Sequence, residues 1–196
     1  MRLTIAIAIL LLFISGCANW KPPENVILVN PGKSVSYMDE VNFSYHKTEP
    51  VSFSELKLCV AESISNDAVT LKDSSNSFVG PFTGTYYQHT NSQTVQGGNV
   101  FKYIDDRASA LIATGTTDGG QTALGLTRDI VKFDLKASSR DTDVKLKFSN
   151  ITRAQQDTGN ASNTGFQPVG TWSGAGAKRI YTSLQAVAEK IKTCLQ

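Results

Sequence analysis

The strict alternation of apolar and polar residues between Val131 and Ser149 constrains the fold of this chain more than any other feature of its sequence. Alternation runs through residues 131–136, and it resumes through residues 144–149 after a polar segment at 138–141. Because side chains of a β-strand point alternately to its two faces, each stretch predicts a strand with one buried and one exposed face. The polar segment predicts the turn between them, so the whole range predicts an antiparallel β-hairpin.

The two faces of the predicted hairpin differ in chemistry. The buried face comprises six apolar side chains: Val131, Phe133, Leu135, Val144, Leu146 and Phe148. The opposite face carries four lysines and one aspartate: Lys132, Lys136, Lys145, Lys147 and Asp134. One apolar and one charged face is typical of an antiparallel sheet that is open to water on one side, and we expect the lysines to form such a solvated face.

Further strands are predicted upstream of the hairpin. They are the segments 26–29, part of 34–45, the weaker candidate 68–71, 100–104 and 110–116. The last two are separated by the polar residues 105–107, which predict a turn. The motif Asp118-Gly119-Gly120 predicts another turn or a flexible loop after residue 116.

The C-terminal segment has the periodicity of an amphipathic helix. Five residues recur at spacings of four, three, four and three: Ile180, Leu184, Val187, Ile191 and Cys194. This spacing places them on one face of an α-helix, with Lys178, Lys190 and Lys192 away from that face. We therefore expect a C-terminal helix whose buried stripe includes Cys194.

A second candidate helix covers residues 52–64. Its apolar stripe comprises Phe53, Leu56, Val60 and Ile64, with Cys59 beside it. A strand over 57–64 is the alternative, and the spacing favours the helix. The order of elements predicts an α+β fold, an antiparallel β-sheet with one or two helices packed on one face. In this pattern the chain loosely resembles the TBP-like folds of some small exported bacterial domains.

The N-terminus has the layout of a secretory signal. Arg2 precedes an unbroken apolar run at 5–13, which is shorter than the 20 or so residues of a membrane-spanning helix, and small residues follow it. The motif Ile14-Ser15-Gly16-Cys17 resembles the lipobox of bacterial lipoproteins. The resemblance implies cleavage before Cys17 and acylation of that cysteine. Ala18 at the next position implies transfer to the outer membrane.

This resemblance divides the chain into three parts. Residues 1–16 are expected to be a signal peptide, and residues 17–25 are expected to be the lipidated cysteine and a short tether. Residues 26–196 are expected to form a single globular α+β domain. The acyl chains would anchor the protein stably, since each buried methylene contributes about 0.8 kcal/mol.

The cysteines predict a disulfide. An exported protein meets an oxidising compartment, in which two thiols tend to pair. Cys59 and Cys194 are the cysteines other than Cys17, so we expect a bridge between them. Two separate buried thiols are the alternative. If both cysteines lie on helices on one face of the sheet, the bridge holds those helices side by side.

Charge and residue types narrow the range of functions. The chain has 19 Lys and Arg against 17 Asp and Glu, a balance that argues against a nucleic-acid partner. Neither His46 nor His89 lies in a catalytic or metal-binding motif, so we predict no catalytic residue, no metal site and no cofactor. Asp105 and Asp106 lie in a predicted turn, where we expect them to cap the backbone or face water.

Two long segments rich in small polar residues, 74–98 and 152–176, are predicted as loops. Loops longer than about 12–15 residues are uncommon unless they are functional or disordered. Aromatic side chains among small polar residues are typical of adaptable binding surfaces. The candidate binding residues are therefore Phe82, Tyr86, Tyr87, Phe166 and Trp172. The alternative is that these aromatics fold back and cover the open face of the sheet.

These features predict an envelope lipoprotein that acts as a non-enzymatic binding or accessory domain at the periplasmic face of the outer membrane. Its acyl chains would bind the membrane. The scarcity of charge in the two loops favours a neutral partner, such as an envelope protein or a glycan. Two other functions stay open, a carrier of a small apolar ligand in a cavity between sheet and helices, and a hydrolase of the cell wall.

Overall fold

A seven-stranded antiparallel sheet is the largest element of the protein. The structure, a computed structural model, describes residues 20–122, 125 and 127–196, so the predicted signal peptide and Cys17 lie outside the described residues. Across the sheet the strands are β1 (Val26–Val29), β2 (Tyr37–His46), β10 (Asp143–Gln155), β9 (Arg128–Arg140), β8 (Ala110–Gln121) and β7 (Phe101–Asp105). The seventh, β11 (Gln167–Pro168), pairs with the far end of β10.

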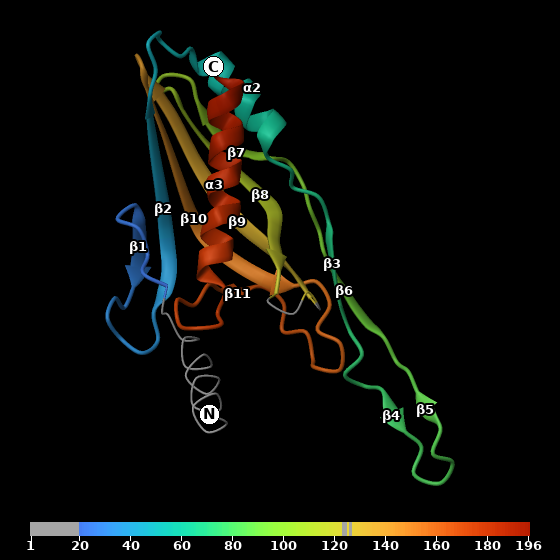
Figure 1. The fold of residues 1–196 in the computed structure, drawn as a ribbon. Coiled ribbons are helices and arrows are strands. Elements are labelled where there is room, and N and C mark those ends of the chain that lie inside the picture. The colour runs from blue at the N-terminus through green and yellow to red at the C-terminus, as the bar shows by residue number, and fades with distance from the viewer. Residues whose placement is uncertain (1–19, 123–124, 126) are drawn as a thin grey trace, which may run out of the picture.

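Two helices, α2 (Phe53–Ser63) and α3 (Ala177–Cys194), cover one face of this sheet (Figure 1). The hydrophobic core lies between the two layers and includes the apolar face of the β9–β10 hairpin and the predicted stripe residues Ile180, Leu184, Val187 and Ile191. The predicted α+β class, with helices on one face of an antiparallel sheet, is therefore confirmed. Neither described helix has the length and apolar character needed to span a bilayer.

The hairpin predicted from the alternating residues is formed by β9 and β10. All six apolar residues predicted to be buried are buried. The turn is tighter than predicted, because residues 138–140 continue β9 and pair with β10, and the chain reverses at Asp141, whose φ is 52°. On the opposite face Lys136 and Lys145 are exposed, as expected of a solvated face.

The prediction of a turn or loop at residues 118–120 is wrong. These residues belong to β8, which continues its pairing with β9 across a bulge. Gly119 lies where α3 passes close to the sheet, and a Cβ there would be 2.8 Å from Cβ of Asp129 and 3.0 Å from Cδ1 of Ile180. The glycine therefore serves a close approach between layers rather than a chain reversal.

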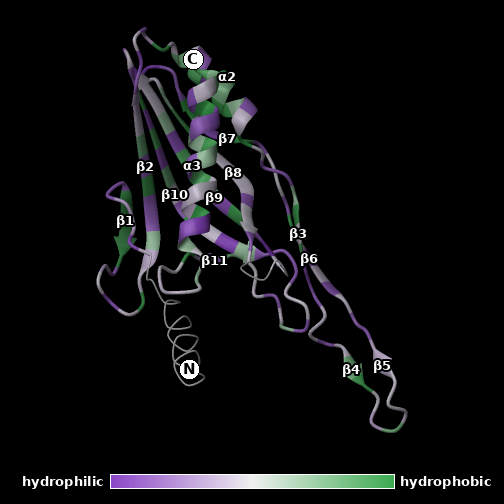
Figure 2. Cartoon of the chain, viewed as in Figure 1, coloured by the Kyte–Doolittle hydropathy of each residue, from purple (hydrophilic) through white to green (hydrophobic). Residues whose placement is uncertain are grey.

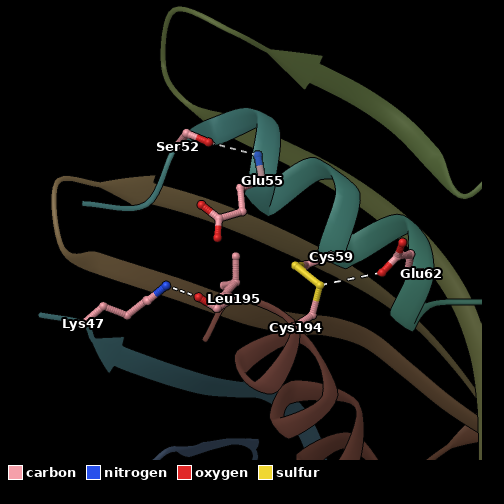
Figure 3. The surroundings of a disulfide bond; sticks show 7 residues. All are labelled: Lys47, Ser52, Glu55, Cys59, Glu62, Cys194 and Leu195. Carbon is pink, nitrogen blue, oxygen red and sulfur yellow. Dashed lines mark hydrogen bonds between the residues drawn. A yellow bond between two sulfur atoms is a disulfide. The ribbon is translucent and has the colours of Figure 1, made fainter. Parts of the chain in front are cut away.

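The predicted disulfide joins α2 to the end of α3 (Figure 3). The Sγ atoms of Cys59 and Cys194 are 2.00 Å apart, and their Cα atoms are 5.5 Å apart. Cys59 is buried, but Cys194 is exposed, so its predicted place on the buried stripe is wrong. Leu195, one turn after Ile191, is buried over the sheet instead, and Cys194 faces α2.

Side-chain hydrogen bonds to the backbone stabilise the two helix ends shown in Figure 3. Ser52 caps α2, its hydroxyl accepting a hydrogen bond from the N–H of Glu55 at 3.2 Å. The alternative of a strand over 57–64 is therefore wrong. In the same region, the Lys47 ammonium donates to the carbonyl of Leu195, which places a cation at the negative end of α3.

The segment 74–98, predicted as a loop, is instead most of a β-hairpin that leaves the body of the molecule. Its two ladders pair β3 (Val69–Asp73) with β6 (Asn91–Val95) and β4 (Phe78–Val79) with β5 (Tyr86–Tyr87). We call residues 69–95 the arm. Figure 1 shows the arm extending away from the sheet, so its aromatic residues do not cover the open sheet face.

Candidate binding surfaces

Exposed apolar and aromatic side chains gather at the far end of the arm. We call residues 78–87 the arm tip, and its exposed members are Phe78, Val79, Phe82, Tyr86 and Tyr87. Phe82, in the connection between β4 and β5, is 99% exposed. Figure 2 shows the apolar colour of β4 separated from the apolar body by the more polar length of the arm. Exposed apolar groups that lie together in this way mark interaction sites.

The arm tip is an ordered hairpin. The N–H of Gly80 donates to the carbonyl of Thr85 at 2.8 Å, and the N–H of Gly84 donates to the carbonyl of Gly80 at 2.9 Å. The rings of Phe78 and Tyr87 stack across the two strands, with centroids 5.1 Å apart and an interplanar angle of 19°. Backbone pairing and ring stacking therefore hold the aromatic surface in place before any partner binds.

The arm carries almost no charge. Residues 74–101 contain no Lys, Arg, Asp or Glu, although these types make up 18% of the chain. Taking an unpaired charge out of water costs far more free energy than taking out a hydroxyl or amide that finds a hydrogen bond. This stretch of surface can therefore be buried against a partner at low desolvation cost.

Asp73 fixes the base of the arm to the body. Its Oδ1 accepts hydrogen bonds from the hydroxyl of Ser75 at 2.6 Å, from Nδ2 of Asn91 at 2.8 Å and from the N–H of Ser75 at 3.0 Å. Its Oδ2 accepts from the N–H of Asn163 at 3.1 Å. These bonds, those from Ser75 and Asn91 above all, hold the pKa of Asp73 well below its ordinary value because they stabilise the charged carboxylate.

The second predicted loop, 152–176, is only partly a loop. Its first four residues continue β10, and Gln167–Pro168 pair with that strand as β11. The remainder borders an open cleft of about 310 Å³, which we call the Trp172 cleft. Its lining comes from β2, from the end of β10, from residues 158–165, from β11 and from the segment 170–172.

The structure does not bring the five predicted binding residues together. Phe82, Tyr86 and Tyr87 share the arm tip, whereas Trp172 lines the cleft. Phe166 is half-buried and is not among the cleft-lining residues. The candidate residues therefore divide between two surfaces.

Sequence reasoning missed part of each surface. Phe78 and Val79 belong to the arm tip, and their apolar character within a polar segment was a signal that could have found them. Tyr37 and Arg153 line the Trp172 cleft. No local signal marks either residue, because only the pairing of β10, β11 and β2 places them beside Trp172.

A buried carboxylate lies next to this cleft. Asp129 of β9 is 0% exposed, and both of its oxygens lie 3.2 Å from Nη1 of Arg153. Nη2 of Arg179, in the first turn of α3, donates to Oδ2 at 2.5 Å. The group therefore holds two cations and one anion, and Arg153, one of the cations, also lines the cleft.

His46 and Asp105 make local contacts at the surface of the protein. Nδ1 of His46 lies 2.9 Å from Oδ1 of Asp143 on the exposed surface. Oδ1 of Asp105 accepts from the N–H of Arg107 at 3.0 Å, which is the expected capping role. Among the described residues no three His, Cys, Asp or Glu side chains are grouped so as to hold a metal ion.

Comparisons with known proteins find a distant relative by sequence and a partly similar solved structure. No family model matches the chain. Competence protein E of Haemophilus influenzae is 28% identical over 133 residues, which cover 61% of this chain and 30% of that protein. Among solved structures, a DUF4468 family protein of Bacteroides ovatus has a TM-score of 0.41 and 10% identity, covering 87% of this chain and 84% of the other. Neither description names an enzymatic activity.

Proposed function

We propose that this chain is a lipid-anchored protein of the outer membrane, facing the periplasm, that acts as a non-enzymatic binding domain. The arm tip is its binding surface, and the partner is an envelope protein with an apolar groove. One observation carries the proposal: an uncharged hairpin holds five apolar or aromatic side chains in water, away from the core.

The geometry of the arm tip favours a groove. Phe78 pairs with Tyr87, and Val79 pairs with Tyr86. Because paired residues share a face and successive residues alternate, the tip presents apolar groups on both of its faces. A groove in a protein covers both faces at once. Aromatic side chains also lose little conformational entropy for the area that they bury.

Two further observations support the location and the accessory role. The resemblance of residues 14–17 to a lipobox supports the anchor, and the few residues between Cys17 and β1 would keep the body close to the membrane. The relative named competence protein E carries no enzymatic term in its name, which supports an accessory rather than a catalytic role.

The alternatives have weaker support. A carrier of an apolar ligand needs a cavity between sheet and helices, where Phe133, Leu184 and Ile191 are fully buried in one core cluster. The Trp172 cleft lies at the surface and is lined by polar as well as apolar groups. A cell-wall hydrolase has no support from Asp105 or Asp129, since one caps a turn and the other pairs with arginines.

In-cell cross-linking of the tagged full-length protein, read out by mass spectrometry, tests the proposal. We expect a defined envelope protein to be captured by the wild type and lost when Phe82, Tyr86 and Tyr87 are all changed to alanine. Tyr103→Ala is the matched control, because Tyr103 is an exposed aromatic residue on β7, outside the arm. Circular dichroism checks that each variant is folded.

Capture that persists in the triple variant would overturn the role of the arm tip. Binding of the tip to phospholipid vesicles or to a glycan, without a cross-linked protein, would overturn the choice of partner. Cys17→Ser tests the anchor separately, since we expect it to release the protein from the outer-membrane fraction while leaving the arm intact.

A further inference from the structure

The Trp172 ring is a fixed aromatic platform. A Cβ at residue 170 would lie 2.2, 2.3 and 2.6 Å from three carbons of the ring, so the ring lies directly against the backbone of Gly170. Tyr37 meets the same ring edge-on, with centroids 5.6 Å apart and an angle of 82°. The side chain is nevertheless 46% exposed. It therefore offers apolar ring surface to the cleft from a defined position.

Backbone hydrogen bonds hold the segment that carries this ring. The N–H of Met38 donates to the carbonyl of Val169 at 2.8 Å, and the N–H of Thr171 donates to the carbonyl of Ser36 at 3.0 Å. Residues on both sides of Gly170 are thus bonded to Met38 of β2 and to Ser36, which directly precedes β2. Preorganisation of this kind lowers the entropy cost of binding a small ligand.

A second part of the lining is equally constrained. Nδ2 of Asn163 donates to the carbonyl of Gln155 at 2.9 Å, and its Oδ1 accepts from the N–H of Gly165 at 3.0 Å. The N–H of Thr158 donates to the carbonyl of Lys72 at 3.1 Å. These bonds fix this part of the lining, which also carries the hydroxyl of Thr164 and the amide of Gln167, and such groups can exchange hydrogen bonds with a polar ligand.

Arg153 is the charged residue of the cleft lining. Asp129 holds it through Nη1, and Asp129 also pairs with Arg179, so the carboxylate does not neutralise both arginines. Within the part of the chain that the structure describes, Nε and Nη2 of Arg153 have no protein acceptor. The cleft therefore combines an apolar platform, neutral hydrogen-bonding groups and a cation with free donors.

We propose that the Trp172 cleft binds a saccharide that carries a carboxylate. The apolar face of a sugar ring would stack on Trp172, its hydroxyls would bond to the neutral lining groups, and its carboxylate would accept from Arg153. The volume of about 310 Å³ is at the lower end of the range for small-molecule sites, which fits one or two sugar rings. This site is separate from the arm tip and goes beyond the function proposed above.

Isothermal titration of the full-length protein in detergent with two disaccharides tests this assignment. The first is N-acetylglucosamine linked to N-acetylmuramic acid, and the second is diacetylchitobiose, which has a similar ring pair without the lactyl carboxylate. We expect saturable binding of the first, about tenfold tighter than of the second, because a hydrogen bond to a charged group is lost. Trp172→Ala should abolish binding of both, and Trp20→Phe should leave both unchanged.

A further variant and a further ligand test the contribution of the Trp172 ring and the choice of a saccharide separately. Gly170→Ala displaces the ring without removing it, and we expect it to weaken binding as Trp172→Ala does. No saturable binding of either disaccharide, or binding unchanged in Trp172→Ala, would overturn the site. Equal affinity for the two disaccharides would overturn the role of Arg153. Adenosine that binds as tightly as the first disaccharide would overturn the choice of a saccharide.

Discussion

At the scale of single residues, the ionisation of Asp73 determines how firmly the base of the arm is held. Folding lowers the pKa of Asp73 from its ordinary value of 3.8, because Ser75, Asn91 and Asn163 donate to the charged carboxylate. The unfolded chain therefore binds the proton more tightly than the folded chain. The carboxylate contributes to stability above about pH 4, and this contribution is lost as the pH falls toward the folded-state value.

Asp73→Asn should open the base of the arm. We expect the amides of β3 and β6 to lose protection from hydrogen exchange in the variant at pH 7. The difference from the wild type should shrink below about pH 4, where the carboxylate of the opened arm takes up a proton while the folded carboxylate does not, so that the stabilisation by the charge falls. Hydrogen exchange with mass spectrometry at several pH values measures this, each variant being compared with the wild type at the same pH. A difference that does not change with pH would contradict the role of the charge.

Single residues also show where sequence reasoning stops. Phe82, Tyr86 and Tyr87 stand out because they are large and apolar within a polar segment. Arg153 does not stand out, since its place in the site depends on an ion-pair cluster formed by residues distant in sequence. Arg153 and Asp129 are 24 positions apart, and Arg179 and Asp129 are 50 positions apart. A cluster of that kind exists only after β9, β10 and α3 have come together.

At the scale of elements, the periodicity of apolar residues predicts those strands and helices that bury one face in the core. β9, β10 and α3 each bury one face, so their apolar residues recur with the period of a strand or a helix. The arm buries Leu71 and Asp73 at its base, but its outer part is exposed, and β6 is rich in polar residues without alternation. A two-stranded ribbon in water leaves no such period in the sequence, which is why this hairpin was predicted as a loop.

The disulfide is the element-scale feature with the clearest energetic effect. It joins residues separated by 135 positions, and closing a loop of that length restricts the unfolded chain strongly. We expect Cys59→Ala with Cys194→Ala to lower the free energy of unfolding by up to about 4 kcal/mol. Urea denaturation of the full-length protein measures the change.

Reduction provides the control for this prediction. A phosphine reductant should lower the stability of the wild type to a similar extent, and it should leave the double variant unchanged. Equal stability of oxidised wild type and double variant would show that the bridge does not stabilise the folded state. Free-thiol labelling before reduction checks that Cys59 and Cys194 are paired in the starting material.

At the scale of the whole molecule, the protein separates a core that determines stability from an arm that presents a surface. The apolar side chains of the arm tip are exposed, whereas the main hydrophobic core lies between the sheet and its two helices. Folding and binding therefore depend on different parts of the chain. This separation permits changes at the tip without loss of the fold.

Replacing residues 77–89 by Asn-Gly should leave the body intact. This change keeps Asp73, Ser75 and Asn91, which hold the base of the arm, and Asn-Gly supplies residues that readily reverse the chain within the shortened connection between β3 and β6. We expect the melting temperature to change by no more than about 2 °C, because surface changes away from packed groups alter stability by about 0.5 kcal/mol or less. Differential scanning calorimetry measures it, and a drop of about 10 °C would show that the tip supports the core.

The junction between arm and body has a mechanical consequence. Lys72 and Ser74 of the arm bond to Gln156 and Gly159, and Asp73 bonds to Asn163. The last of these residues also lines the Trp172 cleft. The base of the arm and one wall of the cleft therefore share Asn163, and a displacement of the arm at this junction would also displace that wall.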